Sequence, residues 1–152
     1  MMIRAAPGNN TVLLKISNLG ELTERGIRHG FFRFAKDLKQ DVNREILRKP
    51  KGGRVYRIRT RSGYRRHTAS APGETHANLS GTLRKSLGWK VRGAKSMEFG
   101  YGVDVTPAPD YAEAVEEGTR RMAARPSLRL GVKRNMRNAE KHFEAGILRR
   151  VA

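Results

Sequence analysis

The chain has 152 residues, a length that fits one domain with a modest core. Its 32 Lys and Arg against 14 Asp and Glu give a net charge of +18, which indicates an acidic partner: nucleic acid, an acidic protein surface or an anionic membrane. The absence of cysteine excludes disulfides and thiolate metal sites and agrees with a reducing cytoplasm. No apolar run approaches the roughly 20 residues of a membrane span, and no secretory signal is recognisable.

The first third of the chain predicts one short strand and one long helix. The strand covers Thr11–Ile16, and the helix begins near Asn18 and ends before Pro50, because the residue ahead of a proline avoids helical geometry. Gly26 and Gly30 weaken the helix, and they mark either a kink or a close approach of another backbone. Apolar residues at steps of mostly three or four give this helix a core-facing side: Leu22, Ile27, Phe31, Phe34, Leu38, Val42 and Ile46.

A strongly basic hairpin is predicted over Arg54–Ala69, with its turn at Ser62-Gly63. The 19 residues from Arg48 to Arg66 contain nine Lys or Arg and no Asp or Glu. Such a hairpin has no apolar face to bury, so it should project from the body. It is either a solvated flexible loop or an arm that faces phosphate or acid, with Tyr56 and Tyr64 among its arginines. The candidate contacts to DNA in a channel or to an acidic partner are Arg54, Arg57, Arg59, Arg61, Arg65 and Arg66.

The middle of the chain predicts a helix and an antiparallel pair of strands. The helix covers Asn78–Leu87, where leucines recur at four-residue spacing. Strands at 89–93 and 97–105 follow, and Gly100 and Gly102 on one face of the second suit a bulge or a close contact. The other face of that strand is apolar: Met97, Phe99, Tyr101, Val103 and Val105.

The last third begins with a short acidic helix from Tyr111, which breaks at Gly118. A basic loop, Thr119–Arg125, comes next, and Pro126 then opens a helix that runs towards Leu148. The basic side of this helix is either a solvated surface or a contact for a partner. Its apolar side consists of Leu128, Val132, Met136, Ala139, Phe143 and Ile147.

Catalytic and metal-binding patterns are not recognisable in the sequence. The four histidines do not share metal-ligand spacing, and an exposed polar role is expected for His67 and His76. Glu113, Glu116 and Glu117 are read as a helix face that forms ion pairs within the chain or between subunits, rather than as an acid–base pair. No enzyme activity, cofactor or metal is therefore expected.

Three segments, in order, resemble the gene-product-ten-like neck proteins of long-tailed bacteriophages, also called tail-completion proteins. The segment "YAEAVEEGT…ARPSL" (Tyr111–Leu128) is similar to that family's Tyr-Ala-x-x-x-Glu-x-Gly-Thr…Ala-Arg-Pro-Phe-Leu pattern. "HTASAPGETHA" (His67–Ala77) and "LSGTLRKSLGWKV" (Leu79–Val91) are similar to its Ala-Ser-x-Pro-Gly-Glu and Thr-Gly-x-Leu-x-x-Ser-Ile segments. The chain departs from the pattern at Ser127, where Phe is usual, and at Glu117, where an aromatic residue is common.

The resemblance implies an α+β subunit. Together with the elements above, it predicts a small antiparallel sheet packed against a long N-terminal helix and a C-terminal helix, with a projecting basic β-hairpin. All of these elements belong to one domain over residues 1–152. The resemblance also implies a structural virion protein that forms a ring around the DNA channel of the neck, either hexameric, which is favoured, or dodecameric. The expected partners are the head-closure or connector proteins, the tail-tube protein and, without sequence preference, packaged DNA, but no membrane. The protein would be in the host cytoplasm during assembly and then in the virion.

The subunit contact of such a ring is expected at the acidic helix and the basic loop, on opposite sides of the contact. Charge reversal at Glu116 should then weaken the ring. The alternative is a small basic nucleic-acid-binding regulator, although no helix-turn-helix, zinc finger or aromatic-rich sheet is recognisable. The proposed interface residues are Tyr111, Glu113, Glu116, Arg120, Arg121 and Arg125.

Overall fold

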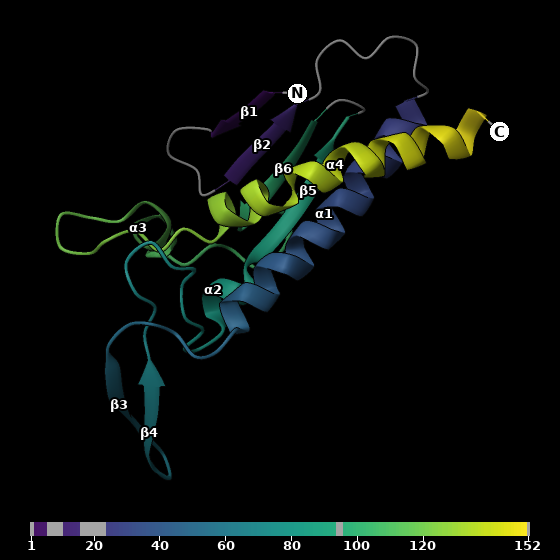
Figure 1. The fold of residues 1–152 in the computed structure, drawn as a ribbon. Helices are drawn as coiled ribbons and strands as arrows, with labels where there is room; N and C mark the ends of the chain where they lie inside the picture. Colours follow the sequence, from purple (N-terminus) through teal and green to yellow (C-terminus); the bar gives the residue numbers. More distant parts are fainter. Residues whose placement is uncertain (1, 6–10, 16–23, 94–95, 152) are drawn as a thin grey trace.

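The computed structural model describes residues 2–5, 11–15, 24–93 and 96–151, and it has the α+β fold that was predicted (Figure 1). A four-stranded sheet packs on a pair of long helices, and a separate two-stranded hairpin projects away from both. The elements in chain order are β1 (Met2–Ala5), β2 (Thr11–Lys15), α1 (Glu24–Leu47), β3 (Val55–Thr60), β4 (Gly63–Thr68), α2 (Thr82–Lys85), β5 (Leu87–Arg92), β6 (Ser96–Tyr101), α3 (Ala112–Glu117) and α4 (Leu128–Val151).

Helices α1 and α4 lie antiparallel and touch through their glycines. A Cβ atom on Gly146 would lie 2.5 Å from the carbonyl oxygen of Gly26, and one on Gly30 would lie 2.6 Å from the ring of Phe143. Farther along, the same contact brings Gly131 against Val42. The glycines in α1 therefore mark a close backbone approach rather than a kink, one of the two predicted alternatives.

The larger sheet is antiparallel throughout, in the order β1-β2-β6-β5. Alternation along β6 turns Met97, Phe99 and Tyr101 towards the helices, where all three are buried, and Trp89 in β5 lies opposite Phe99. Strands β2, β5 and β6 confirm the sequence prediction. Strand β1 was not predicted. The predicted start of the first helix, at Asn18, lies outside the described residues.

Two predicted elements are shorter than expected, and a left-handed residue limits one end of each. Helix α2 is a single turn, since Gly81 at its N-cap has a φ of 84° and Leu87 joins the sheet. Strand β6 stops at Tyr101, because Gly102 and Asp104 have φ values of 79° and 54° and turn the chain back across the sheet. Val105, predicted on the apolar strand face, is therefore exposed.

The start of α4 also differs from its prediction by two residues. Pro126 does not open the helix: the carbonyl of Ser127 accepts the first intrahelical bond, from the Gly131 N–H at 3.0 Å, so Ser127 is the N-cap. The expected close contact at Gly102 is present, since a Cβ there would lie 2.9 Å from the backbone nitrogen of Ala108.

Candidate functional site

One face of the projecting hairpin carries three arginines. In the β3–β4 register, Arg57 lies directly opposite Arg66, and Arg59 lies opposite Tyr64. All four side chains are exposed, and the Arg57 guanidinium lies 5.0 Å from the centre of the Tyr64 ring. Like charges directly opposite one another destabilise a strand pair. None of these arginines forms an ion pair with a carboxylate in the described part of the chain, so an anion from another molecule would relieve the repulsion.

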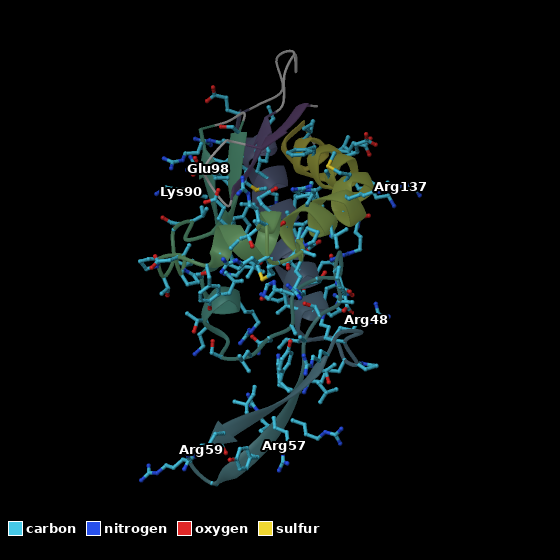
Figure 2. The ribbon with its side chains drawn as sticks, turned by 90° about the vertical axis from the view of Figure 1, so that its left-hand side faces the viewer. Arg48, Arg57, Arg59, Lys90, Glu98 and Arg137 are labelled. Atoms are coloured by element: carbon cyan, nitrogen blue, oxygen red, sulfur yellow. The ribbon has the colours of Figure 1, made fainter. Side chains whose placement is uncertain are left out.

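The opposite face of the hairpin is more mixed and leads back to the body. Tyr56 and Ile58 lie on this face, and the guanidinium of Arg54, just before β3, lies 5.7 Å from the Tyr56 ring centre. The Arg65 side chain donates to the carbonyl of Leu79 at 3.5 Å. The prediction of a projecting basic hairpin is thus confirmed, and Figure 2 shows Arg57 and Arg59 towards its far end. All six candidate arginines are exposed on it: Arg54, Arg57, Arg59, Arg61, Arg65 and Arg66.

Hydrogen bonds fix the root of the hairpin to the body. The Glu74 carboxylate accepts the N–H groups of Gly52, at 3.1 Å, and Ala71, at 2.8 Å, and these bonds hold its pKa below the usual value. The Lys51 ammonium donates to the carbonyl of Thr75 at 3.1 Å, and burial lowers its pKa. The arm therefore extends from an ordered base.

Glu116 is buried within its own chain, with 4% of its surface exposed. One carboxylate oxygen accepts the Ser127 N–H at 2.8 Å, and the other accepts those of Leu128 and Arg129 at 3.0 and 3.1 Å. A negative charge at this helix N-terminus satisfies N–H groups that have no partner within the helix. Burial raises the pKa of Glu116. The expectation that Glu116 faces a neighbouring subunit is therefore wrong: the residue holds the end of α3 to the start of α4.

The remaining residues of the proposed subunit interface lie around the same corner. Tyr111 and Glu113, at the start of α3, are exposed, and so are Arg120 and Arg121 at the tip of the loop. Arg125 is half-buried. Its N–H donates to the Val115 carbonyl at 2.8 Å, and its side chain donates to the Ser70 carbonyl at 3.1 Å.

Helix α3 and the basic loop thus form one surface, rather than opposite sides of a contact (Figure 1). Of the glutamates in α3, Glu117 forms an ion pair with Arg129 at 2.7 Å. Within the described ranges, no arginine of the basic loop forms an ion pair. Acidic side chains of the corner are consequently available to another molecule.

A buried polar cluster connects three distant parts of the chain at this corner. His76 is only 6% exposed, which contradicts the exposed role predicted for it. Its Nδ1 lies 2.5 Å from the hydroxyl oxygen of Ser127 and 3.4 Å from that of Tyr101. Burial lowers the pKa of His76 to about 4 and raises the pKa of Tyr101. Ser127 is fully buried, and its hydroxyl, at the position where the neck-protein pattern has Phe, is a hydrogen-bond partner within this cluster.

Another histidine lies between the two long helices. His142 Nε2 lies 3.0 Å from Asp37 across the α1–α4 contact. Within residues 2–5, 11–15, 24–93 and 96–151, no three His, Asp or Glu side chains are placed to hold a metal ion. None of the helices in these ranges is long and apolar enough to cross a bilayer.

The basic hairpin and the acidic corner are two charged surfaces that the described chain exposes. Neither could be located fully from sequence: the arginine run was visible, but the burial of Glu116 and His76 depends on contacts between residues far apart in the chain. Comparison with protein-family models, curated proteins and solved structures gave no match. Function is therefore inferred from the residues and their geometry.

Proposed function

We propose that this protein is a structural component of a phage neck, where it forms a ring that joins head to tail or completes their connection around the DNA channel. The observation that carries the proposal is that the first and third neck-like segments meet at one corner. Gly73 of the first segment donates to Ala124 of the third at 2.9 Å, and His76 of the first contacts Ser127 of the third. Residues that carry the resemblance therefore have connected structural roles, which supports a shared fold over an accidental match.

The hairpin supports a role beside DNA. Its exposed arginines suit diffuse contacts with phosphate, which give salt-sensitive attraction without reading the base sequence. A ring would repeat this arm around one axis and line a channel with positive charge. Weak, repeated contacts of this kind hold resting DNA without preventing its passage during ejection.

The proposed partners follow from this location. The ring, hexameric in the favoured version and dodecameric in the other, would contact the head-closure or connector proteins on one side and the tail tube on the other. The protein would be made in the host cytoplasm and would then reside in the virion.

Electron microscopy of particles from a phage that lacks this gene tests the proposal. Separate DNA-filled heads and finished tails are expected, and supplying the wild-type chain from a plasmid should restore whole particles. Whole, infectious virions made without the gene would contradict the proposed function.

The alternative is a small nucleic-acid-binding regulator, and one observation favours it: a two-stranded basic ribbon is a shape that some regulators insert into a DNA groove. Salt-dependent binding does not separate the two functions, because both predict it. Selection from random duplex DNA does. An enriched sequence would favour the regulator, whereas uniform binding is expected for the neck protein.

A further inference from the structure

A groove of about 700 Å³ lies between α1 and the edge strand β5. Its apolar floor is aromatic: Phe32 and Trp89 meet edge to face, with ring centres 5.0 Å apart. Phe32 is nevertheless 50% exposed, and Val105, elsewhere in the lining, is also exposed. An exposed aromatic shelf of this kind is typical of a surface that a partner covers.

The rim of the groove is mainly basic. Lys90 and Asp104, both in the lining, form an ion pair with each other at 3.0 Å. Arg25, Arg28 and Lys39 line it from α1, and none of them forms an ion pair with a carboxylate in the described part of the chain. The Nε2 atom of His29, also in the lining, is buried without a hydrogen-bond partner in those residues. An occupant with an aromatic group and carboxylates would match both the floor and the rim.

The chain carries such a group on another part of its surface. The 24 residues from Ser96 to Thr119 contain six Asp or Glu and no Lys or Arg, in a protein with a charge of +18. At the start of α3, Asp110, Tyr111 and Glu113 are all exposed. Neither carboxylate has an ion-pair partner in the described ranges, and Tyr111 is 47% exposed between them. We call Asp110–Glu113 the acidic knob.

We infer that the groove between α1 and β5 receives the acidic knob of a second copy of this chain. Tyr111 would pack on the Phe32–Trp89 shelf, and Asp110 and Glu113 would face the basic rim. Figure 1 places α3 and the N-terminal half of α1 at opposite ends of the fold, so one protomer does not fill its own groove.

Such a contact joins two different surfaces head to tail, and repetition of a head-to-tail contact closes into a ring when the rotation allows. For this closed form the inference rests on the ring proposed above, and it names the surfaces that would build it. It also replaces the expected pairing of the acidic helix with the basic loop, which the structure places on the same corner.

Charge exchange between the two surfaces tests the inference. Arg28→Glu alters only the groove and Glu113→Arg only the knob; both positions are exposed, so folding should be unchanged by circular dichroism. We expect the wild-type chain to form oligomers in sedimentation velocity and each variant to associate at least tenfold more weakly. An equimolar mixture should recover oligomers, because each variant's knob then matches the other's groove. The double variant should also recover them.

Arg137→Glu is the matched control, since it makes the same charge change on α4, on the other side of the fold from Lys90 (Figure 2). It should assemble as the wild type does. Single variants that assemble like the wild type, a mixture that stays dissociated, or a wild-type chain that remains monomeric would each overturn the inference. So would capture of an acidic protein by a chain that never self-associates.

The absence of cysteine permits a second, direct measurement. Phe32→Cys and Tyr111→Cys should form a disulfide-linked dimer when mixed under air, and neither variant alone should do so efficiently. Tyr64→Cys on the hairpin replaces Tyr111→Cys in the control mixture and should give little product. Equal yields in the two mixtures would overturn the inference. The gene-deletion phenotype is independent of these results: rings that survive both variants leave the neck function standing, with a different interface.

Discussion

Replacing Glu116 with Ala removes the acceptor of three backbone N–H groups at the start of α4. Each buried donor left without a partner costs about 1–3 kcal/mol, and loss of the negative charge at the helix N-terminus adds up to about 2 kcal/mol. Since water will reach some of these groups, we expect the free energy of unfolding to fall by about 3–5 kcal/mol in total. For a chain of this size, that corresponds to a drop in Tm on the order of 10 °C.

Glu116→Gln refines the measurement because it keeps the shape of the side chain. Gln retains one carbonyl oxygen and turns an NH₂ group towards a backbone donor, so we expect a loss of about 1–3 kcal/mol. Glu113→Gln is the control, since Glu113 lies one turn earlier on α3 and is exposed. Urea unfolding followed by circular dichroism gives the free energies for all three variants.

The result that would refute this account of Glu116 is a loss for Glu116→Gln within about 0.5 kcal/mol of that for Glu113→Gln, the size typical of surface changes. In that case the three hydrogen bonds would contribute nothing to stability. The corner between α3 and α4 would have to be held by its apolar contacts alone.

Three further outcomes are expected. As pH falls from 6.5 towards 4, the imidazole of His76 takes up a proton in the unfolded chain but not in the folded one, because burial lowers its pKa to about 4. Stability from this group, present above pH 6.5, is therefore lost over that window by about 3 kcal/mol. Urea unfolding at pH 7 and pH 4 should show this loss in the wild type and not in His76→Asn. Gly146→Ala should lower the free energy of unfolding by about 1–3 kcal/mol or more, the usual cost of overpacking. Gly52→Ala is the control, since its Cβ would be 3.5 Å from its nearest neighbour, and it should change the free energy of unfolding little. Arg57→Gln with Arg66→Gln should reduce the slope of log affinity for duplex DNA against log salt by about 2 if both contact phosphate, and an unchanged slope in fluorescence anisotropy would exclude that contact.

The long elements could be predicted because their signals are local and repeated. Seven apolar positions at helical spacing predicted α1, and alternation from Met97 predicted β6. The predicted bounds of helices and strands are wrong where a single backbone angle decides where an element begins or ends. Leucine spacing predicted a helix as far as Leu87. The helix is a single turn because the left-handed Gly81 delays its start and Leu87 pairs with β6 in the sheet. Strand β1 has too few residues to show a period.

The candidate sites divide in the same way. The run of arginines predicted that the hairpin projects from the body, because a segment without an apolar face has no side chains to bury in the core. His76, Tyr101 and Ser127 lie far apart in the chain, and no local pattern joins them. For Glu116 a signal was present: it follows Ala112 by four residues and therefore shares the buried face of α3. The groove was missed because its aromatic floor comes from α1 and β5, which look like ordinary core elements in the sequence.

The hairpin contributes no side chain to the apolar core of the described chain. Mutations along its two strands are thus largely freed from the selection that folding imposes on α1, β6 and α4, and the arm can change length or charge as its surroundings change. A protein built this way can keep one scaffold while its arm adapts to different surroundings. For engineering, the tip between Thr60 and Gly63 is correspondingly the place where an inserted tag or probe should disturb the body least.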